Sequence, residues 1–145
     1  MRRHSRGAAL AVVLVLAAAG MALSSAVATS AALELAMAGQ ATAKQRAFEA
    51  AEAGLGAALR ARAWTADAPW SASGELVAGG AWQAEVRLAA AQVDPVTGAV
   101  EWHFEIESSG RLGAAAVSLV QGFRVAGALP GEPHPTWWRR ADAAP

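Results

Sequence analysis

The chain of 145 residues contains no cysteine, so it can form neither a disulfide framework nor a cysteine-ligated metal site. It also lacks any acidic residue before Glu34 and any proline between Ala8 and Arg62. The part after Leu33 carries nine basic and twelve acidic residues, which give it a net charge of minus three. A nucleic-acid-binding surface requires clustered lysine and arginine, so this composition argues against one.

A long uncharged run occupies residues 8–33, and Arg2, Arg3 and Arg6 precede it. About 20 apolar residues are enough to cross a bilayer as a helix. Basic residues at the amino end place that end in the cytoplasm, so we expect the rest of the chain beyond the inner membrane, in the periplasm. A cleaved secretory signal is the alternative, because the AVA sequence at residues 26–28 has the small-x-small form of a cleavage site.

Helix-favouring residues continue past the apolar run without a break. Residues 34–62 contain no proline and are rich in alanine, leucine, glutamate and arginine. Within them, one apolar stripe recurs at helical spacing, formed by Phe48, Ala51, Leu55, Ala58 and Leu59. We therefore expect one long helix, whose first half is inserted in a membrane and whose second half packs on a sheet.

The hydrophobic period changes to two after a linker at residues 65–80 that is rich in proline, glycine and serine. WQAEVRL (82–88), EWHFEIE (101–107) and VSLVQGFRV (117–125) alternate apolar with polar residues. DPVTG (94–98) and SSGRLG (108–113) provide turns between them. The pattern predicts an antiparallel β-meander with one buried face, which the apolar stripe of the helix can cover. The predicted fold class is α+β.

The tail, residues 127–145, has four prolines and no hydrophobic period, which predicts an exposed irregular segment. It contains Trp137, Trp138, Arg139 and Arg140, and exposed tryptophan and arginine are frequent in contact surfaces. We consider two interpretations of these residues. They contact a partner, or the two tryptophans cap an open edge of the core.

Catalytic and metal-binding patterns are weak in this chain. Four residues of one strand face could ligate a metal, but a solvated strand face has the same pattern; they are Glu101, His103, Glu105 and Glu107. A serine–histidine–acid triad is recognised by geometry and not by sequence, yet no GxSxG elbow is present. The glycines at 54 and 56 lie inside the expected helix, unlike those of a phosphate loop. We expect no enzyme activity, no metal and no cofactor.

Two stretches of the amino-terminal part carry a family resemblance. Residues 6–16 are RGAALAVVLVL, and residues 34–55 are ELAMAGQATAKQRAFEAAEAGL. Together they resemble the start of PilX-type type IV pilus assembly proteins, which have a basic-Gly-Ala-Leu start followed by E-x-x-MAG-N and AFQAAEAAL patterns. The matching residues are Glu34, Met37, Ala38, Gly39, Ala47, Phe48, Ala50, Ala51, Glu52, Ala53 and Leu55. The chain departs from the pattern at Leu35, Ala36, Gln40 and Glu49.

The resemblance implies a pilin-like fold and a minor pilin of the type IV pilus. It implies a leader at residues 1–7, cleavage by prepilin peptidase between Gly7 and Ala8, and N-methylation of Ala8. Residues 8–33 would form the transmembrane or filament-core helix, and residues 34–62 its amphipathic extension. Residues 63–126 would be the periplasmic β-domain with its linker, followed by the tail at 127–145. The implied partners are other minor pilins, the major pilin and a tip adhesin.

The fifth residue after the expected cleavage site bears on the role within a filament. It is Val12 here, whereas most major pilins carry a glutamate that pairs with the terminal amine of a neighbouring subunit. PilX-like proteins and the K-type pseudopilins of type II secretion resemble this chain in that respect, and both are implied to sit at a filament tip. We therefore expect a role in priming pilus assembly or at the pilus tip. A K-type-like pseudopilin and a membrane-anchored periplasmic binding module are the alternatives.

Overall fold

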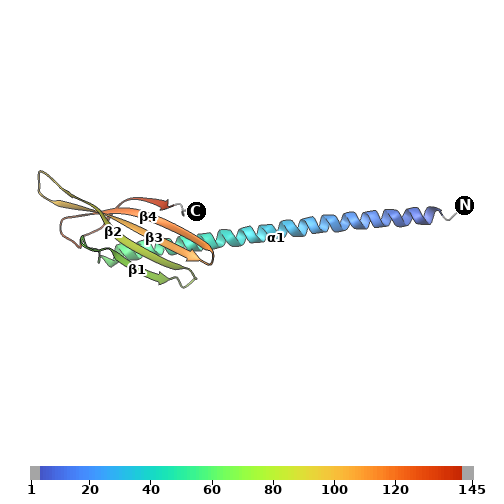
Figure 1. Ribbon diagram of the computed structural model, residues 1–145, viewed down its shortest axis with the longest axis horizontal. Helices are drawn as coiled ribbons and strands as arrows, with labels where there is room; N and C mark the ends of the chain where they lie inside the picture. The colour runs from blue at the N-terminus through green and yellow to red at the C-terminus, as the bar shows by residue number, and fades with distance from the viewer. Residues whose placement is uncertain (1–3, 142–145) are drawn as a thin grey trace. The chain divides into compact units, whose positions relative to one another are not determined.

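The computed structural model describes residues 4–141, and its side chains from Leu10 onward. Its elements are α1 (His4–Ala61), β1 (Trp70–Glu75), β2 (Ala81–Val93), β3 (Val100–Leu112), β4 (Ala115–Ala126) and β5 (His134–Ala141) (Figure 1). The chain forms two compact units, the first ending at Gln40 and the second beginning at Ala41. The first unit contains only the amino-terminal part of α1, and the second holds its continuation and the whole sheet.

The helix α1 runs without interruption for 58 residues, which confirms the expectation of one long helix. No proline interrupts it, and its isolated glycines each cost only about 1 kcal/mol in a helix interior. Arg60 lies in the last turn, where a cation interacts favourably with the carbonyl end of the helix. The helix ends because Arg62 adopts a left-handed conformation, with φ of 47°, in the position that often terminates helices.

The five strands form one antiparallel sheet in the order β1-β2-β3-β4-β5, so each strand pairs with its neighbours in sequence. The predicted meander and the α+β class are therefore confirmed. The predicted alternation is also correct: Ala84, Val86, Phe104 and Ile106 are all buried in the face that packs against the helix. The DPVTG turn lies where expected, between β2 and β3, and is closed by backbone hydrogen bonds between Asp94 and residues 98 and 99.

Both edge strands are additions to the three that the sequence predicts. β1 lies in the expected linker, and β5 lies in the tail that was expected to be irregular. β1 alternates in burial but has only small and polar residues after Trp70, so its hydrophobic signal is weak. β5 includes Pro135 and does not alternate in burial. Proline is tolerated in edge strands, where half of the backbone groups need no partner in the sheet. The irregular-tail prediction is therefore wrong for residues 134–141.

The predicted turn at residues 108–113 also needs correction, because β3 continues to Leu112. Serine and glycine serve a different purpose here, which is to let α1 approach the sheet closely. Ser108 is fully buried, and its hydroxyl donates a hydrogen bond of 2.8 Å to the carbonyl oxygen of Ala51. A Cβ atom at Gly110 would overlap the carbonyl oxygen of Ala47 and the amide nitrogen of Ala51. Small residues on both elements therefore permit backbone contact.

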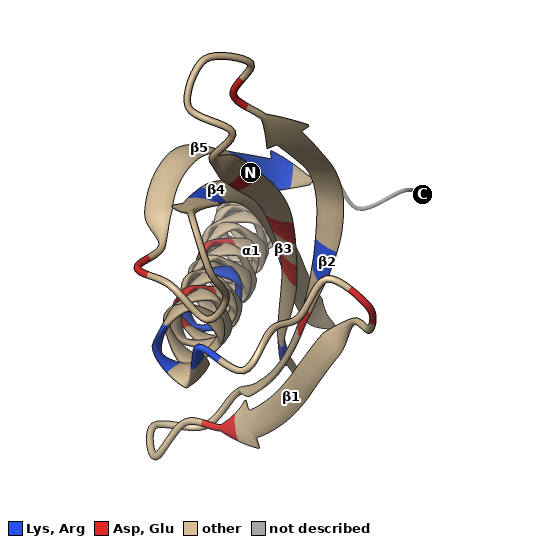
Figure 2. Cartoon of the chain, turned by 90° about the vertical axis from the view of Figure 1, so that its left-hand side faces the viewer, with Lys and Arg blue, Asp and Glu red and all other residues tan. Residues whose placement is uncertain are grey.

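The core of the second unit lies between the helix and the concave face of the sheet, which curves around α1 (Figure 2). Ala51, Leu55 and Ala58 of the predicted stripe are buried, whereas Phe48 and Leu59 are only partly buried at its margin. Trp64 follows the end of the helix and packs edge-on against Phe123, with ring centroids 5.2 Å apart. The two phenylalanines Phe104 and Phe123 stack at the same centroid distance of 5.2 Å. This aromatic group closes the core beyond the last turn of α1.

Candidate functional site

In the first unit, α1 exposes every side chain that the structure describes, from Leu10 to Gln40. Many of these side chains are large and apolar: Leu10, Val12, Val13, Leu14, Val15, Leu16, Met21, Leu23, Val27, Leu33, Leu35 and Met37. In the described part of the chain, α1 is the one helix long and apolar enough to cross a membrane. A helix that is apolar on all sides is stable only when lipid or other helices surround it.

Three hydroxyl groups of this apolar segment donate hydrogen bonds within the helix itself. Ser24 donates to the carbonyl of Gly20, and Thr29 donates to the carbonyl of Ser25, each at 2.9 Å. Ser25 in turn donates to the carbonyl of Ala22 at 2.9 Å. Each polar group in a hydrocarbon environment must find a partner, and these hydroxyls find theirs without a second chain. These three residues are therefore compatible with insertion in a membrane.

The expected processing site lies at the start of α1. Residues 1–3 of the expected leader are outside the described residues, and Gly7 and Ala8 belong to the helical backbone. Cleavage between Gly7 and Ala8 and N-methylation of Ala8 stay predictions. Val12 is 58% exposed, and the first carboxylate along the sequence is that of Glu34. The segment that the expected cleavage would leave at the amino end therefore has no acidic group to pair with a neighbouring amine.

The family-motif residues divide between two environments. The first group is exposed and lies in the first unit: Glu34, Met37, Ala38 and Gly39. In the second unit, Ala47, Ala50 and Ala51 have no exposed surface, and Leu55 is almost completely buried. Phe48 and Ala53 are partly buried, and Glu52 is exposed on the opposite side of the helix. The alanines of this motif thus form the surface on which β3 lies, as the contact with Gly110 requires.

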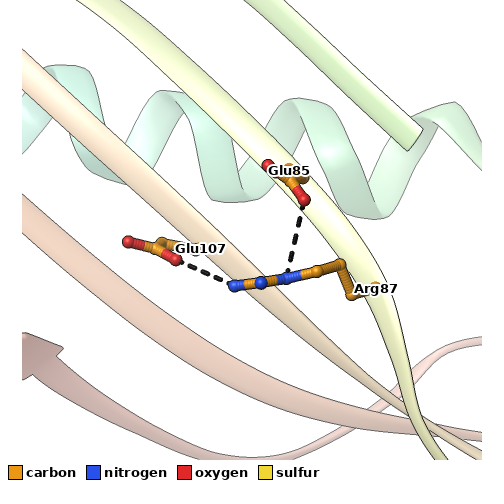
Figure 3. A network of polar contacts seen from close by, with 3 residues as sticks. All are labelled: Glu85, Arg87 and Glu107. Carbon is orange, nitrogen blue, oxygen red and sulfur yellow. Dashed lines mark hydrogen bonds and ion pairs between the residues drawn. The ribbon is translucent and has the colours of Figure 1, made fainter. Parts of the chain in front are cut away.

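Two carboxylates of the strand face that could have ligated a metal, Glu101 and Glu107, lie beside arginines. Arg87 lies between two carboxylates, with its Nη2 atom 3.1 Å from Glu107 and its Nε atom 3.5 Å from Glu85 (Figure 3). Arg124 and His103 approach the Oε1 atom of Glu101 at 3.4 and 3.3 Å. These groups are all a third or more exposed, so each pair contributes little to stability. The arrangement is that of a solvated strand face with interleaved charges.

The four tail residues singled out by the sequence all lie on β5. Trp137 pairs with Gly122, and Trp138 with Gln121; Arg139 and Arg140 follow opposite Val120 and Leu119. Because side chains alternate along a strand and Leu119 belongs to the core, Trp138 is on the helix side and Trp137 on the outer side. Trp137 is 45% exposed and Trp138 is 63% exposed. Neither belongs to the buried core of the second unit.

The indole of Trp137 lies beside Gly122 on the outer side of the sheet. A Cβ atom at Gly122 would overlap its indole Nε1 atom, so the glycine provides the space that the ring occupies. The guanidinium carbon of Arg139 is 5.6 Å from the Trp137 ring centroid, within the range of a cation–π contact. The sequence could not reveal this arrangement, because it depends on the pairing of β4 with a strand that the sequence did not predict.

Comparison with known protein families finds a match for the amino-terminal part of the chain. Residues 6–55 match the family model described as PilX N-terminal. This segment is similar to PilX N-terminal regions. It covers the apolar helix and the whole motif from Glu34 to Leu55, so the resemblance inferred from the sequence is confirmed. The PilX match supports a minor-pilin role in the type IV pilus and association with other pilins. No curated protein and no solved structure matches the chain.

Proposed function

We propose that this chain is a minor pilin that primes assembly of the type IV pilus or sits at its tip. The match of residues 6–55 to the PilX N-terminal family is the observation that carries the proposal. The absence of an acidic residue from Ala8 to Leu33 supports the tip or priming role. A subunit without that carboxylate lacks the group that would pair with the terminal amine of a neighbouring subunit in the filament.

In this proposal the chain enters the inner membrane with its amino end in the cytoplasm and its sheet unit in the periplasm. The basic residues Arg2, Arg3 and Arg6 favour that orientation. Prepilin peptidase cuts after Gly7, and Ala8 becomes N-methylated. The exposed apolar residues of α1 then pack against the helices of other minor pilins and of the major pilin. Small residues such as Ala18, Gly20 and Ala22 allow close packing of helices in apolar surroundings.

The processing step is tested by the mass of the amino-terminal peptide of protein purified from the membranes of its native host. We expect a peptide that begins with N-methylated Ala8. Gly7→Val should leave the leader attached, because the peptidase requires glycine before the cut. Gly20→Val is the matched control, since no described atom lies within 4 Å of a Cβ built there. An intact Met1, or a new end near Ala28, would contradict the pilin pathway.

The cellular role is tested by deleting the gene and scoring surface pili, twitching motility and type II secretion together. We expect pili and twitching to be lost while secretion continues, and both to return with the wild-type gene. Complementation with Gly7→Val should fail. Loss of secretion with pili retained would instead indicate a pseudopilin, and no change in either would indicate a membrane-anchored binding module outside both systems.

A further inference from the structure

β5 is the last strand of an open sheet, and its surroundings leave it uncovered. It pairs with β4 on one side only. Every side chain from His134 to Arg140 is exposed, and only Ala141 is partly buried. At an edge strand, alternate backbone N–H and C=O groups point away from the sheet and can pair with another strand. β5 therefore presents both free backbone groups and exposed aromatic side chains.

Protection of this edge is confined to its beginning. Proline blocks strand addition because it has no N–H to donate, and Pro133 and Pro135 lie at or just before the start of β5. No proline follows from Thr136 to Ala141. The unprotected part of the strand is thus the part that carries the two tryptophans and two arginines. Their side chains lie on both faces of the edge, where a strand added to β5 would place its own side chains.

The charge of the edge indicates which strand would fit. Among residues 10–141, no carboxylate pairs with Arg139 or Arg140, although Arg87 and Arg124 on the central strands do have carboxylate partners. Both arginines of β5 are exposed. A second β5 in an antiparallel pair centred on residues 139 and 140 would bring four arginines together along one edge, and like charges across a strand pair are destabilising. A strand that carries carboxylates would instead neutralise both positions.

We propose that β5 accepts an extended, carboxylate-bearing strand of another protein by β-strand addition. The added strand pairs with the backbone from Trp137 to Ala141, beyond the β-bulge at Thr136, and its acidic side chains meet Arg139 and Arg140. Its remaining side chains pack beside Trp137 and Trp138, which supply apolar area at the edge. This inference deepens the proposed minor-pilin function, because it assigns the surface and the chemistry by which the chain would bind a neighbouring subunit.

The test uses the full chain in detergent micelles and a short synthetic peptide of alternating glutamate and valine. Two control peptides have lysine in place of glutamate, or proline at central positions of the acidic sequence. Amide hydrogen exchange is followed by mass spectrometry in β5 and in β1, which is the opposite edge. We expect the acidic peptide to slow exchange in residues 137–141 and to leave β1 unchanged. Neither control peptide should protect β5.

Two charge-reversal variants separate a specific contact from general attraction. Arg139→Glu with Arg140→Glu should weaken binding of the acidic peptide by about tenfold or more. Lys44→Glu with Arg60→Glu makes the same change in net charge on exposed positions of α1 in the second unit and should have little effect. Trp138→Ala should weaken binding severalfold with an unchanged far-ultraviolet circular dichroism spectrum, because this side chain is outside the core.

Several results would overturn the proposal. Equal binding of the lysine peptide would remove the charge argument, and equal binding of the proline peptide would remove strand addition. Absence of any protection in β5 by the acidic peptide would also contradict it. Protection that rises with protein concentration alone would identify a second copy as the occupant. Each outcome is independent of leader cleavage and of the pilus phenotype, so failure here and failure of the minor-pilin proposal are distinguishable.

Discussion

The two units of the chain share one helix but use it in different ways. From Leu10 to Gln40 every side chain of α1 is exposed, including a dozen large apolar ones. From Ala41 to Ala61 the helix buries one alanine-rich face against β3 and exposes the other. Local helix propensity is high in both halves, so it does not explain the difference. The second half finds its partner within the chain, whereas the first half requires a partner from outside it.

The largest difference in stability between the two units should come from glycine substitutions. Gly110→Ala places a Cβ atom on the backbone of Ala47 and Ala51, which cannot move without displacing the helix. We expect it to lower the free energy of unfolding of the second unit by about 3 kcal/mol or more. Gly39→Ala in the first half meets no atom within 4 Å and should be neutral or slightly stabilising. Thermal unfolding of both variants in detergent, followed by circular dichroism, measures the difference.

An equal loss of stability in the two glycine variants would contradict the assigned close approach of α1 and β3. A compensating variant sharpens the test. Because the clash at Gly110 is with main-chain atoms, shortening side chains elsewhere on the helix should not restore stability. If shortening a side chain of α1 did restore the stability of Gly110→Ala, the contact between α1 and β3 would have to be made by side chains.

Two serine substitutions, one in each unit, should show a smaller difference in stability of the same kind. Ser108→Ala removes the buried hydrogen bond to the carbonyl of Ala51, and we expect a loss of about 1 kcal/mol in the free energy of unfolding. Ser24→Ala removes a hydroxyl that bonds only to the preceding turn of its own helix, so the sheet unit should keep its stability. Chemical denaturation followed by tryptophan fluorescence reports on the second unit, where all the tryptophans lie. A larger loss of unfolding free energy for Ser24→Ala than for Ser108→Ala would contradict the assignment of the buried hydrogen bond to the stability of the second unit.

The sequence predicted the parts of this molecule in which one periodic pattern decides the structure. The uninterrupted helix and the alternation of Val86, Phe104 and Ile106 followed from local residues alone. The ends of the sheet did not, because β1 and β5 are stabilised by pairing with β2 and β4 and have little pattern of their own. Residues 108–112 were mistaken for a turn because serine and glycine are common in turns, whereas here they make room for the helix.

The candidate site shows the same division. The family motif from Glu34 to Leu55 was visible in the sequence because it is local and continuous. The four residues of β5 were noticed by composition, but their arrangement required the pairing of Trp137 with Gly122 and of Arg139 with Val120. Composition identified the residues, and only the register showed that they form an exposed edge with aromatic groups on both faces.

The smallest expected effect concerns the far hairpin of the second unit, which is held by local bonds and not by the helix. The Oδ1 atom of Asp94 accepts the backbone N–H groups of Val96 at 2.8 Å and Thr97 at 3.2 Å. These bonds favour the charged form and lower the pKa of Asp94 below its ordinary value of 3.8, the bond from Val96 having the largest effect. Because the pKa of Asp94 is lower in the folded state, its charged form stabilises the hairpin at pH values above the unfolded pKa. That contribution is lost as the pH falls through the folded pKa.

We therefore expect the amide resonances of Val96 and Thr97 to stay constant from neutral pH to about pH 5, and to shift only in the acidic range below the ordinary aspartate value. Asp94→Asn should abolish that shift while the core resonances of Phe104 and Ile106 stay unchanged at neutral pH. A titration midpoint at or above the ordinary value would mean that these two backbone hydrogen bonds do not form in solution.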